Sequence, residues 1–127
     1  MAKILIADDD AHMLRVLSMW LVRNGHDVLE ASNGEQAQTI LANTDVDLMI
    51  SDVNMPGTDG FGLIKWLRQH KDRNLPAMLL TSRCDQKSIA DRLEPYDVHI
   101  HPKPFSPSRL VVEIERLLAP VMTDEPA

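Results

Sequence analysis

Short apolar runs alternate with longer segments of helical period along almost the whole chain. Three runs are apolar on both alternating faces, which is typical of strands buried in a parallel sheet, at residues 4–7, 48–50 and 77–80. Two weaker runs, at residues 28–29 and 98–100, suit flanking strands. Strands and helices that alternate in this way predict a doubly wound, parallel α/β sandwich.

Segments of helical period separate these runs. The well-marked ones lie at residues 10–24, 34–43, 61–67 and 107–117. Gly25 is a natural stop for the first, and the last has Ser106 as its expected N-cap and Pro107 at the first helical position. A further helix over residues 85–94 has few apolar anchors and is expected to be the easiest to displace.

Length and composition indicate one globular domain. With 127 residues, of which 44% are hydrophobic and 25% charged, the chain can bury a core without disulfides. We assign residues 1–119 to this domain and the polar, proline-bearing residues 120–127 to a C-terminal tail or the start of a linker. The net charge of −6 and the scattered basic residues argue against binding of nucleic acid through its phosphates.

The sequence predicts a cytoplasmic protein without a membrane segment. Its apolar runs are too short to cross a bilayer. The first of them is followed directly by three aspartates, which is unlike a signal peptide. A single cysteine, Cys84, can form no internal disulfide, which favours a reducing compartment.

Acidic and polar side chains follow the predicted strands at the points where they end. Asp8-Asp9 and Asp52 follow two of the best strands, Thr81 follows the third, and Lys103 follows the last. Ligands of such folds bind beyond the carboxyl ends of the strands, so these residues predict a site. Three carboxylates together would repel one another and need a cation, and oxygen ligands without cysteine favour Mg²⁺.

Asp52 in such a cluster has the chemistry of a phosphoryl acceptor. A carboxylate can attack phosphorus and form an acyl phosphate, while Mg²⁺ and Lys103 neutralise charge on the moving oxygens. Thr81 would hydrogen-bond a phosphoryl oxygen and register the modification. Asp8 and Asp9 have helix capping as their alternative role, but Asp10 is placed to cap the helix itself.

These residues together resemble the receiver domain of bacterial two-component response regulators. The resemblance covers residues 3–118 and rests on four motifs in order, namely Asp8-Asp9, the Asp-Val-Asn-Met-Pro-Gly-Thr-Asp-Gly segment at 52–60, Thr81-Ser82 and Lys103-Pro104-Phe105. Each motif is weak alone, but their joint order is specific. The resemblance implies a flavodoxin-like receiver fold, with a five-stranded parallel sheet in the order 2-1-3-4-5 and helices on both faces.

The resemblance also implies a role in a phosphorelay. A sensor histidine kinase or a histidine phosphotransfer protein would phosphorylate Asp52, and a downstream protein target or a covalently linked output domain would respond. Mg²⁺ would be bound by Asp9 directly, by Asp8 directly or through water, by Asp52, and by the backbone carbonyl of Asn54. The chain would then be a regulatory phosphoacceptor and not an enzyme with a separate substrate. Dimerisation through the last helices and strand is compatible with this role.

The switch implied by the resemblance involves Lys103, which would contact the phosphoryl group, and Thr81, which would swing towards it. The Lys103-Pro104 bond is usually cis in the family, which would aim the lysine. One departure concerns the read-out, because Ile100 stands where receivers commonly carry Tyr or Phe. We therefore expect Thr81 and the helix at 85–94 to convey activation.

Three other functions are compatible with this type of fold. One is a pseudo-receiver that docks partners without being phosphorylated, although the full set of acids argues against it. An aspartyl-phosphate phosphatase would need a second acid two residues after the nucleophile, where this chain has Asn54. A flavin-binding protein would need a phosphate loop after the first strand, where three aspartates would repel the ligand.

Overall fold

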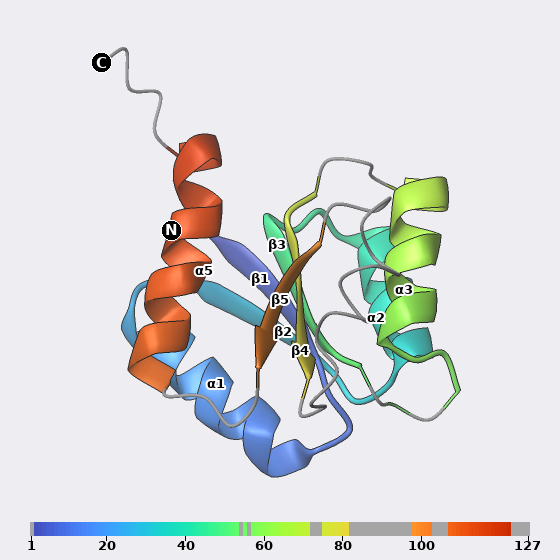
Figure 1. The fold of residues 1–127 in the computed structure, drawn as a ribbon, viewed down its shortest axis with the longest axis horizontal. Helices are drawn as coiled ribbons and strands as arrows, with labels where there is room; N and C mark the ends of the chain where they lie inside the picture. Colours follow the sequence, from blue (N-terminus) through green and yellow to red (C-terminus); the bar gives the residue numbers. More distant parts are fainter. Residues whose placement is uncertain are drawn as a thin grey trace.

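Five parallel strands form one sheet in the order β2-β1-β3-β4-β5 (Figure 1). This computed structural model describes residues 2–53, 55, 57–71, 75–81, 98–102 and 107–122. The strands are β1 (Lys3–Ala7), β2 (Asp27–Ala31), β3 (Leu48–Asp52), β4 (Ala77–Thr81) and β5 (His99–Pro102). The predicted strand order and the parallel direction are confirmed.

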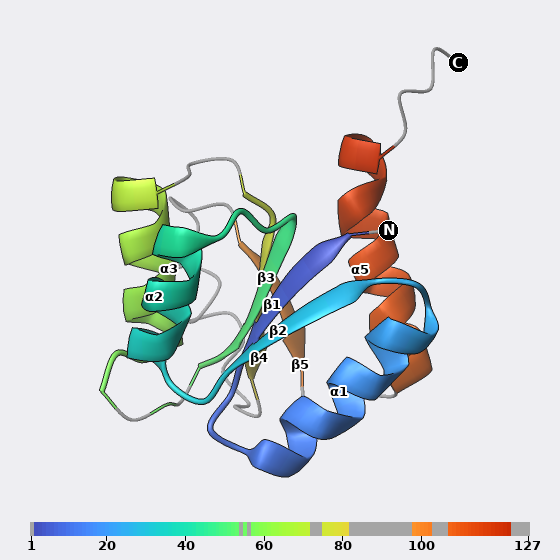
Figure 2. The same cartoon turned by 180° about the vertical axis from the view of Figure 1, so that it is seen from behind.

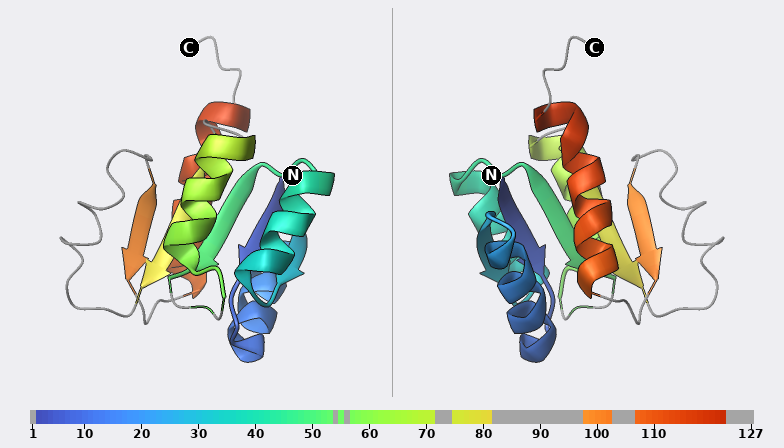
Figure 3. Two further views of the ribbon diagram at one scale, coloured as in Figure 1. Left: turned by 90° about the vertical axis from the view of Figure 1, so that its right-hand side faces the viewer. Right: turned by 90° about the vertical axis from the view of Figure 1, so that its left-hand side faces the viewer.

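Helices cover both faces of the sheet. Their bounds are α1 (Ala11–Arg23), α2 (Gly34–Asn43), α3 (Gly60–Trp66), which continues as a π-helical turn η1 (Leu67–Lys71), and α5 (Pro107–Met122). Helices α1 and α5 lie on one face, and α2 and α3 lie on the other (Figures 2 and 3). The result is the three-layer sandwich that the alternation of strands and helices predicts.

Each face of the sheet has its own hydrophobic core, because side chains along a strand point alternately to the two faces. Leu5 and Met49 pack with α2 and α3, whereas Ile4, Ile6 and Ile50 pack with α1 and α5. All five side chains are buried almost completely. This two-sided burial explains why these strands are continuous apolar runs in the sequence.

Local signals determine where the helices begin and end. The side chain of Asp10 caps α1 by accepting hydrogen bonds from the backbone N–H groups of His12 and Met13. After α1 the chain turns at Gly25, whose φ of +89° lies in the left-handed region that favours glycine. Asp59 caps α3 in the same manner as Asp10, by accepting from Gly62 N–H at 2.9 Å.

The C-terminal helix is longer than the sequence indicated. Helix α5 begins at Pro107 as predicted but continues to Met122, so the first three residues of the predicted tail, 120–122, are helical. A proline near a helix end removes only one backbone hydrogen bond, and buried Leu110, Ile114 and Leu118 hold the preceding turns against the sheet. Residues 106 and 123–127, and the helix predicted at 85–94, lie outside the described residues.

None of the described helices combines the length and the apolar character that crossing a bilayer requires.

We expect the core beneath α1 to be sensitive to truncation. Leu17 is 0% exposed, so Leu17→Ala should lower the free energy of unfolding by about 2–5 kcal/mol, through lost burial and the cavity left behind. Val22 lies on the same helix but is 57% exposed, so Val22→Ala should change it by no more than about 0.5 kcal/mol. Urea unfolding of both variants measures the difference, and equal losses would contradict this assignment of the core.

Candidate metal centre

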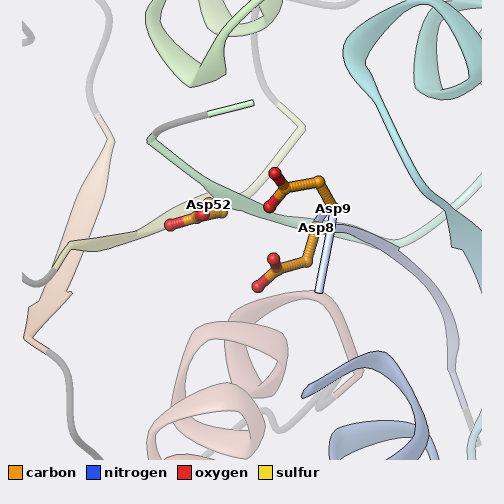
Figure 4. Close-up of side chains that lie close together, drawn as sticks. All are labelled: Asp8, Asp9 and Asp52. Carbon is orange, nitrogen blue, oxygen red and sulfur yellow. The ribbon is translucent and has the colours of Figure 1, made fainter. Parts of the chain in front are cut away.

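Three aspartates converge at the carboxyl edge of the sheet. Asp52 is the last residue of β3, while Asp8 and Asp9 directly follow β1, the strand paired with β3. Each offers a carboxylate oxygen, and these oxygens all lie within 4.8 Å of one another. Figure 4 shows the three side chains grouped around a common space. The predicted convergence of these residues is therefore confirmed.

The two aspartates after β1 differ in their surroundings. Asp8 is 1% exposed, its N–H donates to the carbonyl of Ala31 at 3.0 Å, and its Oδ1 accepts from Asp10 N–H at 3.0 Å. Asp9 is exposed. Because Asp10 provides the helix cap, neither Asp8 nor Asp9 is needed for that purpose. A buried and an exposed carboxylate side by side suit a cation that is reached from solvent.

Asp52 is held by the backbone around it. Its Oδ1 accepts from Val53 N–H at 3.0 Å, and that N–H also lies 3.2 Å from the carbonyl of Leu80 on the neighbouring strand. The side chain is half-buried at the strand end. This arrangement orients the Asp52 carboxyl group before any ligand arrives.

The donor set fits a hard divalent cation. Carboxylates this close repel one another, and a bound cation offsets the repulsion. Among the residues that the structure describes, no histidine or cysteine joins the group, so the ligands are the oxygen donors that Mg²⁺ prefers. An all-oxygen set of three protein groups also leaves coordination positions for water or phosphate.

Gly60, the last residue of the motif at 52–60, is a structural requirement of the site. A Cβ atom on this residue would lie 2.4 Å from the carbonyl oxygen of Asp52. Gly60 N–H also donates to the carbonyl of Val53 at 2.9 Å. Helix α3 therefore begins directly against the strand end that carries Asp52. The sequence signal for this close contact was a glycine directly after an aspartate that caps a helix.

The remaining predicted site residues have different outcomes. Thr81 is 1% exposed and ends β4, one residue beyond Leu80, the register partner of Asp52. It therefore lies at the same edge of the sheet. Lys103 and Asn54 lie outside the described residues, and their roles stay predictions. Ile100, at the position of the usual aromatic residue, is half-buried and packs against the core under α2 and α3.

Known proteins are similar to this chain in sequence. Residues 4–115 match the family model described as "Response regulator receiver domain". The transcriptional regulatory protein ResD of Bacillus subtilis (strain 168) is 34% identical over 116 residues, which cover 91% of this chain and 48% of that protein. The chain therefore spans about half the length of the curated relatives it matches.

Solved structures of receiver domains are similar to this chain in fold. The signal receiver domain of a signal transduction histidine kinase from Syntrophus aciditrophicus is 33% identical, with a TM-score of 0.86 over 100% of this chain and 97% of that one. The response regulator TrrA from Thermotoga maritima, solved in complex with Mg²⁺-BeF, is 28% identical, with a TM-score of 0.82 over 93% of this chain and 100% of that one. With its match over residues 4–115, this chain belongs to the family of response-regulator receiver domains.

Proposed function

We propose that this receiver domain accepts a phosphoryl group on Asp52 in a Mg²⁺-dependent phosphorelay and that this modification switches its protein–protein contacts. The convergence of Asp8, Asp9 and Asp52 at the carboxyl edge of the sheet carries the proposal. The relative TrrA was solved with Mg²⁺-BeF, which supports a site of this kind in the family. A pseudo-receiver, a phosphatase and a flavin-binding protein are not favoured by these observations.

The residues that would hold Mg²⁺ are Asp8, Asp9 and Asp52, together with the backbone carbonyl of Asn54. When bound, the ion supplies positive charge that stabilises the charge developing on the transferred phosphoryl oxygens. Asp52 is half-buried and Asp9 is exposed, so a phosphodonor can reach the site from solvent.

The proposed reaction is an in-line transfer to the Asp52 carboxylate. A carboxylate oxygen attacks phosphorus and forms a new P–O bond, while the bond from phosphorus to the donor nitrogen or oxygen breaks and its electron pair leaves with the donor. Val53 N–H holds the carboxyl group in one orientation during the attack. Lys103 would pair with the phosphoryl group, and the acyl phosphate is later hydrolysed by water.

Thr81 would report the modification. Its position at the end of β4, beside Asp52, supports a hydrogen bond from its hydroxyl group to a phosphoryl oxygen. Moving a buried threonine displaces the segment that follows it, which includes the helix predicted at 85–94. With Ile100 in place of the aromatic residue, this movement would be the main route of the signal.

The partners follow from this role. We infer a sensor histidine kinase or a histidine phosphotransfer protein as donor, and a downstream protein or a linked output domain as target, with a homodimer as an alternative active form. ResD is a transcriptional regulatory protein and the Syntrophus relative is part of a histidine kinase, so the family supports linked partners of both kinds. The protein would work in the cytoplasm and turn over no substrate besides its own phosphoryl group.

Phosphorylation should depend on one aspartate and on Mg²⁺. Incubation with acetyl phosphate and Mg²⁺ should give a single phosphoryl adduct in intact-mass measurements of the wild type, and none in Asp52→Asn or with EDTA. Asp27→Asn is the matched control, because Asp27 is an exposed aspartate outside the carboxylate group, and it should be modified like the wild type. An equal adduct in Asp52→Asn would rule out Asp52 as the acceptor. No adduct together with no beryllofluoride binding would favour a docking pseudo-receiver.

Removing one carboxylate should have opposite effects with and without Mg²⁺. Without the ion, Asp9→Asn should raise the midpoint of thermal unfolding by about 4 °C, the effect of relieving about 1 kcal/mol of repulsion in a domain of this size. With Mg²⁺ at 100 times its Kd, the wild type should gain about 2.7 kcal/mol, and Asp9→Asn should gain much less. Thermal scans in EDTA and in Mg²⁺, with Asp27→Asn as control, measure both effects. An equal gain in Asp9→Asn would contradict its role as a ligand.

A further inference from the structure

We propose that Glu35 is a positioning residue of the phosphoryl and metal site, which acts through Thr58 on the loop that follows Asp52. The inference rests on the proposed function, because it assigns to Glu35 an influence on the Mg²⁺ affinity of the carboxylate group. Glu35 itself is not a member of that group.

A single carboxylate oxygen of Glu35 holds Thr58 at two points. Oε2 accepts a hydrogen bond from the Thr58 backbone N–H at 2.9 Å and another from Thr58 Oγ1 at 2.8 Å. Glu35 lies in the first turn of α2, and Thr58 directly precedes Asp59, the cap of α3. The contact therefore ties the loop between β3 and α3 to the start of a different helix.

Two glycines make room for this contact. A Cβ atom on Gly34 would lie 2.2 Å from the carbonyl oxygen of Thr58, so the first residue of α2 packs directly on the loop backbone. Gly57 has a φ of +73°, and a Cβ there would lie 2.7 Å from Glu35 Oε1 and 2.8 Å from Oε2. Larger residues at these positions would push the helix start and the loop apart.

The same loop is fixed at its other end beside the metal centre. Val53 N–H donates to Leu80 at 3.2 Å, and the Val53 carbonyl accepts from Gly60 N–H at 2.9 Å. Residue 54, whose carbonyl is the proposed fourth ligand, lies in the sequence between Val53 and Thr58. If Thr58 is released, the loop loses its tie to α2 and keeps the contacts that Val53 and Gly60 make beside Asp52.

The contact favours the ionised form of Glu35. Hydrogen bonds from the Thr58 hydroxyl and the Thr58 backbone N–H lower the pKa of this exposed carboxyl group below its ordinary value. A lowered pKa means that the contact stabilises the ionised carboxylate at neutral pH, and that this added stabilisation is lost in acid, as the pH falls through the folded-state pKa. Exposed glutamates usually bind only water. Glu35 instead accepts two hydrogen bonds from one loop residue, which supports a role in holding that loop.

Three variants separate positioning from charge and from general stability. Glu35→Ala removes the acceptor, while Glu35→Gln keeps one side-chain oxygen that can accept both hydrogen bonds. Glu30→Ala is the matched control. Glu30 is also exposed and also accepts from a hydroxyl group, but that group belongs to Ser18 of α1 and not to the loop. The readouts are Mg²⁺ affinity by isothermal titration calorimetry, the amide proton shift of Thr58 by NMR, and the unfolding midpoint.

We expect Glu35→Ala to weaken Mg²⁺ binding about three- to tenfold, somewhat less than the loss of a residue that touches a metal ligand directly. Glu35→Gln and Glu30→Ala should stay within about twofold of the wild type, as independent surface changes do. The Thr58 amide should shift upfield in Glu35→Ala alone. The double variant Glu35→Ala/Thr58→Val should bind Mg²⁺ no more weakly than Glu35→Ala, because both changes break one contact.

Wild-type affinity in Glu35→Ala would overturn the inference and leave the proposed function intact. Equal weakening in Glu30→Ala would also overturn it, by showing that only the negative charge matters. Weakening in Glu35→Gln as large as in Glu35→Ala would do the same. A wild type that binds no Mg²⁺, while its Thr58 amide still responds to Glu35→Ala, would instead refute the proposed function, and with it any influence of Glu35 on a metal site.

Discussion

Burial of the parallel sheet on both faces is the constraint on which the candidate site depends. Each central strand contributes to two hydrophobic cores, so the strands cannot slide or separate without exposing apolar side chains. The ends of β1 and β3 are therefore held together, and with them Asp8, Asp9 and Asp52. These like charges, which would otherwise separate, are kept within reach of one cation. Burial of apolar side chains in the two cores offsets their repulsion.

The loop between β3 and α3 connects the packed helices to the group of three aspartates. At the α3 end of this loop Gly60 packs on the carbonyl of Asp52, and Thr58, two residues earlier, is held by Glu35 from α2. Both contacts rely on glycines, because a side chain on Gly34 or Gly60 would collide with the loop or strand backbone. These contacts fix the backbone around the strand end that carries Asp52.

The accuracy of the sequence predictions follows from the range of the interactions involved. The strands, the Asp10 cap and the turn at Gly25 depend on neighbouring residues and were predictable. The extent of α5 was not, because Pro120 signals a helix end locally, whereas the buried side chains that hold this helix on the sheet act through tertiary contacts. The contact between Glu35 and Thr58 was missed for the same reason, because the two residues are 23 positions apart in the chain.

By itself, the sequence determined the class of fold, the family and the set of acids, because apolar periodicity and residues at strand ends are local properties that survive without coordinates. Only the tertiary structure decided that the oxygens of Asp8, Asp9 and Asp52 lie within 4.8 Å of one another, that Asp8 is buried while Asp9 is exposed, and that Glu35 reaches the loop after Asp52. These distances and exposed fractions depend on contacts between residues that lie far apart in the chain. They are set by how the layers pack and not by any local preference.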